Sequence, residues 1–347
     1  MYQLQAKLLP KSGKIATFFG RFCYLTLILF ILVSCDTTET KKKTTTRRTT
    51  DSAPYELLLV ADKDWLQTSD GSVLTDVVYA EIPGLPAPES NFKVISINPS
   101  GFNKTFQSFA NIVYIDFGSQ YDKPDMRIAV DVYAHPQKIV YLTAPNGRAL
   151  AELAMQRGEQ IIDIFVNAEL QRERELLTRH HSTTVLNQVK ELFGYTMYAP
   201  ANIDASKTGE DFIWASSSAE DNRINICVYT YPYVSEEDFS HERFIQTRDS
   251  VMRINILGEK PGQYMATNPQ TVLSRTTTFN NQFLFEARGL WEMKHDMMGG
   301  PFVSYSRIDT TRQLVVVAEG FVYAPEKKKR AYIRELEAAL QTLTLNQ

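Results

Sequence analysis

The sequence of 347 residues contains 37 Lys and Arg against 40 Asp and Glu, a formal net charge of −3. This balance argues against nucleic acid as a partner, because phosphate binding requires a basic surface. The length suits one large domain or two smaller ones, and the 17 Tyr and 19 Phe can supply a core without disulfides or metals.

The N-terminal stretch has the three parts of an export signal. An apolar run over 22–33 follows a start that carries basic but no acidic residues, namely Lys7, Lys11, Lys14 and Arg21. The run ends in Leu32-Val33-Ser34-Cys35, which resembles the lipobox of bacterial lipoproteins. We expect residues 1–34 to be a signal peptide and the Cys35 thiol to be the lipidation site. The alternative, an uncleaved transmembrane anchor, needs about 20 apolar residues, more than this run contains.

Cleavage before Cys35 changes both the charge and the cysteine content. It removes four basic and no acidic residues, so 33 basic residues face 40 acidic ones in the mature chain. Cys23 leaves with the signal and lipid blocks Cys35, so Cys227 is the remaining thiol and no internal disulfide can form. Its strand-like surroundings favour a small buried residue over a reactive thiol. The sequence shows no metal-ligand spacing and no cofactor motif.

Residues 35–53 form the predicted lipidated tether. They are nearly all Thr, Lys, Arg, Asp and Glu, and they lack large apolar side chains. Such a segment cannot bury enough surface to offset its conformational entropy.

The first folded half is predicted to span 54–180. A helix is expected after Ser72, and a long helix capped by Asn146 is expected from 147 to about 177. The patterns predict strands at 55–61, 92–97, 110–117, 126–133 and 137–143.

The second half is predicted to span 181–347. It opens with a helix that begins near Ser182 and ends at Gly194, where a left-handed residue is favoured. Further helices are expected within 237–255 and after Pro325. Strands are expected at 212–216, 224–231, 271–279, 282–288, 302–308 and 313–323.

Together the elements predict an α+β fold with mixed, mainly antiparallel sheets and helices packed on one face. Both halves give strands, a helix ended by a Pro/Gly turn, further strands and a long helix. This order suggests two similar halves that arose by internal duplication.

Several segments of the second half are distinctive as a set. They are Phe212-Ile213-Trp214, Arg248-Asp249-Ser250, Gly289-Leu290-Trp291-Glu292-Met293 and the stretches 298–304 and 319–325. Their succession resembles a family of lipoproteins of unknown function from the Bacteroidetes phylum. The resemblance implies an envelope location and a family without an assigned activity, and it carries over no catalytic residues.

The residues after Cys35 bear on the expected location. Bacteroidetes lipoproteins bound for the cell surface often carry an acidic cluster just after the cysteine. Here Asp36 and Glu39 are separated by threonines, which matches that signal only loosely. We therefore expect a lipid-anchored protein of the cell envelope, on the outer membrane and facing the periplasm.

The segment 288–302 is the main candidate for a binding loop. Its candidate residues are Arg288, Trp291, His295, Asp296, Gly299, Gly300 and Phe302. An aromatic, a His and an acid can bind a ligand, and a carboxylate can support an imidazole base. The competing interpretation is structural, because adjacent side chains usually point apart and the glycines can serve a tight turn.

These observations favour a membrane-anchored envelope lipoprotein whose folded part is a non-catalytic binding or assembly module. Its expected partners are the membrane, through the lipid, and an envelope protein or glycan. Tyr229, Tyr231 and Tyr233 would suit such an interface. The alternatives are an envelope hydrolase-like enzyme that uses the loop from Trp291 to Phe302, and a purely structural outer-membrane component.

Overall fold

The first described strand, β1, lies at residues 48–49, within the segment predicted to be the tether. The computed structural model describes residues 48–218 and 223–345, so the predicted signal peptide, Cys35 and most of the predicted tether lie outside the described residues. Strand β1 (Arg48–Thr49) pairs in parallel with β6 (Ala134–His135). This pairing uses backbone groups, which explains how a stretch without large apolar side chains joins the fold.

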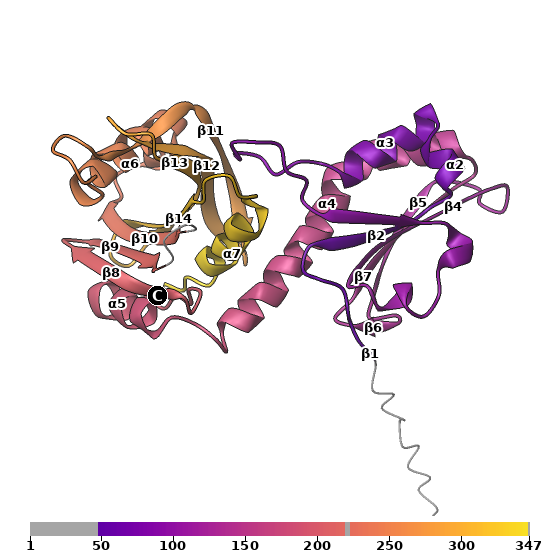
Figure 1. Cartoon of the computed structure of the whole chain (residues 1–347), viewed down its shortest axis with the longest axis horizontal. Coiled ribbons are helices and arrows are strands. Elements are labelled where there is room, and N and C mark those ends of the chain that lie inside the picture. Colours follow the sequence, from indigo (N-terminus) through magenta and orange to yellow (C-terminus); the bar gives the residue numbers. More distant parts are fainter. Residues whose placement is uncertain (1–47, 219–222, 346–347) are drawn as a thin grey trace, which may run out of the picture. The chain divides into compact units, whose positions relative to one another are not determined.

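A five-stranded sheet forms the centre of the first half (Figure 1). In sheet order its strands are β3 (Lys93–Ile97), β2 (Glu56–Val60), β4 (Asn111–Phe117), β7 (Lys138–Ala144) and β5 (Asp125–Val130). The first four run parallel, and β5 pairs antiparallel with β7. Helices α2 (Lys63–Leu66) and α3 (Ser69–Val78) lie in the connection from β2 to β3.

Helices α3 and α4 cover one face of this sheet (Figure 1). Helix α4 (Gly147–Leu177) has the predicted bounds. The side chain of Asn146 caps it, because its Oδ1 accepts the N–H of Ala149 at 2.9 Å. The buried side of α4 packs into one core with the sheet, through residues that include Leu150, Ala154, Ile161, Phe165, Val113, Ile115, Val140 and Leu142.

A seven-stranded antiparallel sheet organises the second half. In sheet order its strands are β11 (Met265–Phe279), β12 (Gln282–Met293), β13 (Gly299–Asp309), β14 (Leu314–Tyr323), β10 (Arg223–Pro232), β9 (Phe212–Ser217) and β8 (Ile203–Gly209). Helix α5 (Thr183–Phe193) precedes them and ends, as predicted, at Gly194 with a left-handed φ of 74°. Strand β8 was not predicted, because it is mostly exposed and lacks an alternating pattern.

Helices cover both faces of the seven-stranded sheet. Helix α7 (Arg330–Gln341) packs on one face, where a Cβ added at Gly320 would lie 2.8 Å from the Cβ of Leu336. Helix α6 (His241–Asn255) packs on the other face through Phe244 and Met252. Strands β10 and β14 are therefore buried along most of their length.

The architecture confirms the predicted α+β class with mixed, mainly antiparallel sheets. It differs from the prediction in two details. The sheet of the first half is largely parallel, and the sheet of the second half carries helices on both faces rather than one. Because the two sheets differ in topology, the internal duplication stays unconfirmed.

A buried ion pair ties α6 to the sheet. The guanidinium of Arg248 on α6 and the carboxylate of Glu319 on β14 are 2.7 Å apart, and both side chains are fully buried. Arg248 also donates to the Oγ1 of Thr267 at 2.8 Å and lies 4.2 Å above the ring of Phe302. Cys227 pairs with Glu319 across the two strands and is fully buried, which confirms the prediction for this thiol.

We predict that Glu319→Ala lowers the free energy of unfolding by about 3–5 kcal/mol, because it leaves the buried charge of Arg248 without its partner. The double variant Arg248→Met/Glu319→Leu removes both charges and should restore most of the loss. Breaking the exposed pair of Arg148 and Glu152 by Arg148→Ala should change stability by less than about 1 kcal/mol. Urea unfolding followed by circular dichroism measures all three, and a cost below about 1 kcal/mol for Glu319→Ala would contradict this account.

Candidate functional site

The face of the five-stranded sheet opposite α4 presents different side chains from the buried face. Successive residues of a strand point to opposite faces. On β4, Val113 packs toward α4, while Tyr114 and Asp116 lie on the open side. Strand β7 repeats this pattern with Tyr141 and Thr143 on the open side. Each strand therefore carries an aromatic and a polar residue on the face that the helices leave uncovered.

The register of β4, β7 and β5 arranges these side chains in rows. From the amino to the carboxyl ends of β4 and β7, the rows are Ile112 with Ile139 and Ala129, then Tyr114 with Tyr141 and Arg127, then Asp116 with Thr143 and Asp125. The open face thus changes from apolar through aromatic to polar along the strands. Ligands of open α/β sheets commonly bind near the carboxyl ends of the parallel strands.

The connection from β3 to β4 covers the apolar row and reaches the aromatic row through Phe102. It contains the short 3₁₀ helices η1 (Pro99–Gly101) and η2 (Phe106–Ser108). Phe106 and Phe109 of this connection pack in the cluster that includes Ile112 and Ile139. The rest of the aromatic row and the polar row stay open beyond it.

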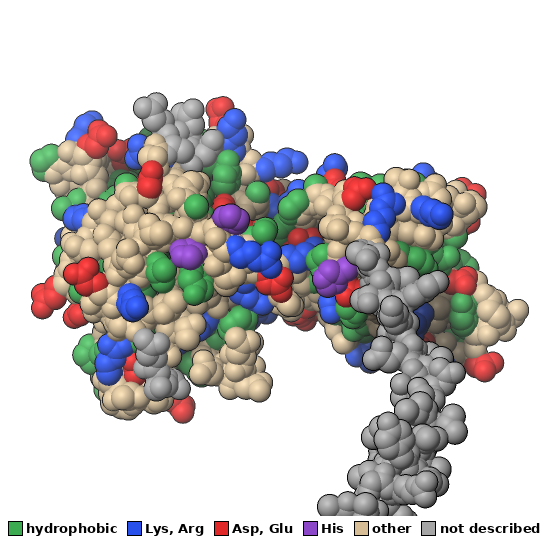
Figure 2. All heavy atoms as spheres, turned by 90° about the horizontal axis from the view of Figure 1, so that it is seen from below, with side chains coloured by type: hydrophobic (Ala, Val, Ile, Leu, Met, Phe, Trp, Pro, Cys, Tyr) green, Lys and Arg blue, Asp and Glu red, His purple; other side chains and the backbone are tan. Residues whose placement is uncertain are grey.

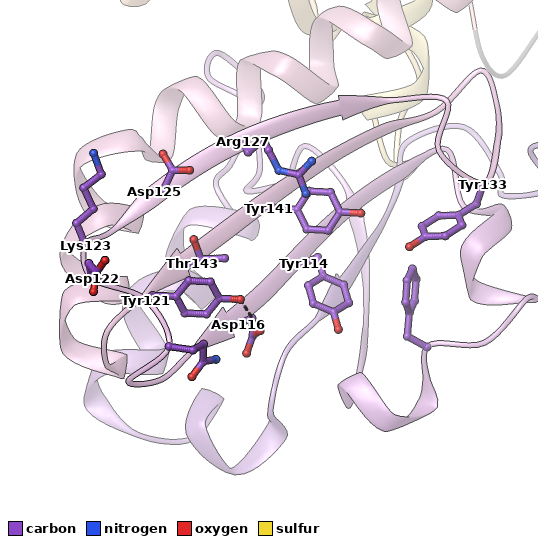
Figure 3. A pocket seen from close by; sticks show the side chains of 12 residues that line it. Tyr114, Asp116, Tyr121, Asp122, Lys123, Asp125, Arg127, Tyr133, Tyr141 and Thr143 are labelled. Carbon is purple, nitrogen blue, oxygen red and sulfur yellow. Dashed lines mark hydrogen bonds between the residues drawn. The ribbon is translucent and has the colours of Figure 1, made fainter.

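These two rows form the floor of a pocket of about 730 Å³, which we call the tyrosine pocket (Figure 3). It is lined by Phe102, Tyr114, Asp116, Gln120, Tyr121, Asp122, Lys123, Asp125, Arg127, Tyr133, Tyr141 and Thr143. Figure 3 shows Tyr114 and Tyr141 side by side, with Tyr133 at one end and Lys123 at the other.

Ring and polar contacts hold the side chains of the pocket in place. The guanidinium carbon of Arg127 lies 4.4 Å from the centre of the Tyr141 ring. The ring of Phe102 meets the rings of Tyr114 and Tyr133 edge-on, at centroid distances of 5.5 and 5.7 Å. At the polar end, the hydroxyl of Tyr121 donates to Oδ2 of Asp116 at 2.7 Å.

A buried glutamine fixes the loop that carries Tyr133. The side-chain oxygen of Gln137 accepts the N–H of Tyr133 at 3.0 Å. Its side-chain nitrogen donates to the carbonyls of Gln107 and Phe109 at 2.8 and 2.7 Å. The loop is thereby joined to the β3–β4 connection, so Tyr133 is positioned before any ligand binds.

Three phenols of the pocket, those of Tyr114, Tyr121 and Tyr141, are held in the protonated form. Burial raises the pKa of Tyr141 to about 12, with a further contribution from Tyr133 that outweighs the opposing charge of Arg127. Burial, and then the charge of Asp116, raises the pKa of Tyr114. The pKa of Tyr121 is raised because its hydroxyl donates to the carboxylate of Asp116. Around neutral pH these groups are hydrogen-bond donors.

The aromatic members of the sequence-predicted binding loop are part of the core of the second half. Trp291 and Phe302 are 2% and 1% exposed, and Trp291 donates its indole N–H to the carbonyl of Val322 at 3.1 Å. A Cβ at Gly300 would lie 2.0 Å from that same carbonyl oxygen, so the position requires glycine. These three residues have structural roles.

The remaining members do not converge on one point. Arg288 forms an ion pair with Glu337 at 2.8 Å. Gly299 lies opposite Glu292 in the ladder between β12 and β13. The tyrosines at 229, 231 and 233 also pack around the core under α6, with Tyr229 only 2% exposed.

His295 and Asp296 lie at the tip of the β12–β13 hairpin. The carboxylate of Asp296 accepts from the side-chain N–H of Gln263 at 2.9 Å and from the N–H of Met297 at 2.6 Å. Within the described part of the chain, no hydrogen bond joins the side chains of His295 and Asp296. A binding role for this tip stays a prediction.

Nothing in the described ranges gathers three or more His, Cys, Asp or Glu side chains in an arrangement that could hold a metal ion. The tyrosine pocket contains aromatic rings, phenol hydroxyls, carboxylates, two cationic side chains, an amide and the hydroxyl of Thr143, but no His, Cys or Ser. This chemistry suits the non-covalent binding of a ligand that has both apolar faces and hydroxyl or amide groups.

The sequence analysis did not select the residues of the tyrosine pocket. The signal that could have found them is the motif Tyr-x-Asp at 114–116 and its counterpart Tyr-x-Thr at 141–143. In both, the intervening residue is apolar, so the tyrosine and the polar residue share one face.

Two family models match the chain. Residues 182–342 match one described as a domain of unknown function (DUF4837), and residues 51–178 match another described as a domain of unknown function (DUF8532). No curated protein matches. Among solved structures, the crystal structure of human STARD10 is 10% identical, with a TM-score of 0.21. That match covers 46% of this chain and 80% of the STARD10 chain, and its TM-score is too low to support an inference.

We predict that Tyr141 stays neutral at pH 11, because its pKa of about 12 lies above the value of about 10 of an unfolded tyrosine. The folded state then binds more protons than the unfolded state between these values. The contribution of this phenol to the free energy of unfolding is therefore fully present below about pH 10 and is lost as the pH rises toward 12. NMR of tyrosine labelled with ¹³C at Cζ measures the titration, and the signal missing in Tyr141→Phe assigns it. A midpoint near pH 10 would show that burial does not shift this phenol.

Proposed function

We propose that the chain is a lipid-anchored lipoprotein of the cell envelope whose folded part is a non-catalytic binding module. The observation that carries the binding role is the tyrosine pocket, an open hollow of about 730 Å³ with ordered aromatic and polar rows. Concave sites with rings and a few positioned polar groups are the usual form of ligand-binding sites.

The anchor is proposed from the sequence around Cys35. The motif Leu32-Val33-Ser34-Cys35 ends an apolar run that is too short to span a membrane comfortably. The set of motifs in the second half resembles lipoproteins of the Bacteroidetes. Acyl chains contribute about 0.8 kcal/mol per buried methylene, so two or three chains would hold the protein firmly on a bilayer. No helix within the described residues is long and apolar enough to cross a membrane.

We further propose the outer membrane as the location, with the folded part facing the periplasm. The support is the loose spacing of Asp36 and Glu39 among threonines, which differs from the compact acidic cluster of surface-bound lipoproteins.

The hydrolase-like alternative depends on the loop from Trp291 to Phe302, and this loop does not bring a nucleophile next to a base. At the hairpin tip, the carboxylate of Asp296 is occupied by Gln263 and Met297 rather than by His295. The hydrolase-like alternative therefore has less structural support than binding.

We predict that Cys35→Ala abolishes metabolic labelling with a palmitate analogue, because the acyl acceptor is lost. Cys23→Ala should leave labelling unchanged, since this residue lies inside the predicted signal peptide. Gel fluorescence of the labelled protein, normalised to its amount on an immunoblot, gives the result. Persistent labelling of Cys35→Ala would end the lipoprotein proposal.

We predict that the double variant Arg127→Ala/Tyr133→Ala retains at most about one tenth of the envelope material that the wild type retains. Both side chains are exposed, so their loss should not unfold the protein. Full-length protein in nanodiscs is fixed on beads and incubated with envelope fragments from cells that lack it, and retained protein and hexose are measured.

The matched control is Tyr79→Ala/Arg148→Ala, which removes an exposed tyrosine and an exposed arginine elsewhere in the first half. It should retain as much material as the wild type. His295→Ala should do the same, and would lose binding if the hairpin tip were the site. Equal retention by the wild type and Arg127→Ala/Tyr133→Ala would refute the proposed role of the pocket.

A further inference from the structure

We propose that the tyrosine pocket binds an uncharged carbohydrate. This inference rests on the proposed binding function and names the class of its ligand. A sugar ring presents C–H groups on its faces and hydroxyl groups around its edge. A complementary site therefore needs aromatic faces next to groups that donate and accept hydrogen bonds.

The lining of the pocket has this combination and lacks aliphatic side chains. Five of its residues are aromatic, and the other seven are polar or charged. Pockets for acyl chains or apolar peptide side chains are lined mainly by hydrophobic residues, aliphatic ones included. The faces of aromatic rings carry the negative part of a quadrupole and attract C–H groups, which suits the faces of a sugar.

The rings are arranged as a platform on the sheet. The centroids of Tyr114 and Tyr141 are 5.6 Å apart, with an angle of 46° between their planes. Phe102 connects Tyr114 to Tyr133, so the aromatic surface continues to the end of the pocket. Because the guanidinium of Arg127 lies over the ring of Tyr141, a sugar would stack on the neighbouring rings and meet this guanidinium where it reaches Tyr141.

The polar row beside the platform supplies the hydrogen bonds. Asp116, Thr143 and Asp125 lie next to one another across three strands. The carboxylates accept hydrogen bonds from sugar hydroxyls, and the hydroxyl of Thr143 can donate or accept. Arg127 appears in none of the ion pairs among the described residues, so its N–H groups can serve a ligand from above Tyr141.

The charges in the pocket argue against an acidic ligand. Three aspartates face one lysine and one arginine, which gives the lining a formal charge of −1. On the face shown in Figure 2, acidic and basic side chains are interspersed and neither sign forms a broad field. Repulsion at the lining therefore favours neutral sugars over polyanions.

The same residue types distinguish a glycan from a protein partner. Asp and Lys are depleted at the centres of protein interfaces, whereas Tyr and Arg are enriched. Here three Asp and one Lys line the pocket beside four Tyr and one Arg. Carboxylates in this position match the many hydroxyl donors of a carbohydrate better than the core of a protein interface.

The test uses full-length protein in nanodiscs and measures the binding that depends on Tyr133. Envelope fragments from cells that lack the protein are left untreated, treated with periodate and a muramidase to destroy sugars, or treated with proteinase K. Dextran, yeast mannan, arabinoxylan and polygalacturonate are tested as soluble probes of known composition. The binding of each fragment preparation and of each soluble probe is measured for the wild type, Tyr133→Ala and Tyr133→Phe.

We expect Tyr133→Ala to weaken binding at least about tenfold, and Tyr133→Phe to stay within about threefold because it keeps the ring. Periodate and the muramidase should remove the Tyr133-dependent binding, whereas proteinase K should leave it. At least one neutral polysaccharide should bind more tightly than polygalacturonate.

Two outcomes would overturn the inference and leave the binding function in place. One is Tyr133-dependent binding that proteinase K destroys and the sugar-cleaving treatments do not, which would identify a protein partner. The other is a preference for polygalacturonate over every neutral probe. If no retained material depends on Tyr133, Arg127 or their combination, the proposed binding function itself is wrong.

Discussion

The parallel register between β4 and β7 determines which side chains lie next to one another in the tyrosine pocket. It places Tyr114 beside Tyr141 and Asp116 beside Thr143. Because side chains alternate along a strand, a shift of one residue in β7 would turn Tyr141 toward α4 and bring Val140 to the open face. The fully buried position of Val140 in the core under α4 opposes that shift. The apolar face sealed by α4 therefore also fixes the composition of the opposite, open face.

The two sheets use their aromatic residues differently, because their faces are covered differently. In the second half α6 and α7 enclose both faces, so Trp291 and Phe302 are part of the core. In the first half only one face is enclosed by helices, and Tyr114 and Tyr141 remain partly exposed. The hairpin contains the more conspicuous motif in the sequence, yet the less conspicuous tyrosines line the pocket. What separates them is the covering of each sheet, which a local motif does not encode.

Features with local causes could be predicted from the sequence. Helix α4 has the predicted bounds, because the Asn146 cap and the helical spacing of apolar residues are local signals. The end of α5 at Gly194 was predicted for the same reason. The candidate site could not be predicted, because Tyr114 and Tyr141 meet only through the register of two strands that are distant in sequence. The strand β1 was missed because backbone hydrogen bonds leave no pattern in the side chains.

The proposed anchor and the proposed ligand are physically compatible. The tyrosine pocket is open and has no buried, fully desolvated centre, so one pocket should bind one sugar segment only weakly. Many copies tethered to one membrane would face the repeating units of a polymer at the same time. Linked binding events of this kind can raise the overall affinity by about 10²–10⁴ without any new contact. An anchored protein can therefore use a shallow, open pocket. The membrane holds many copies together, and their combined binding does what an enclosed site would do through tighter contacts.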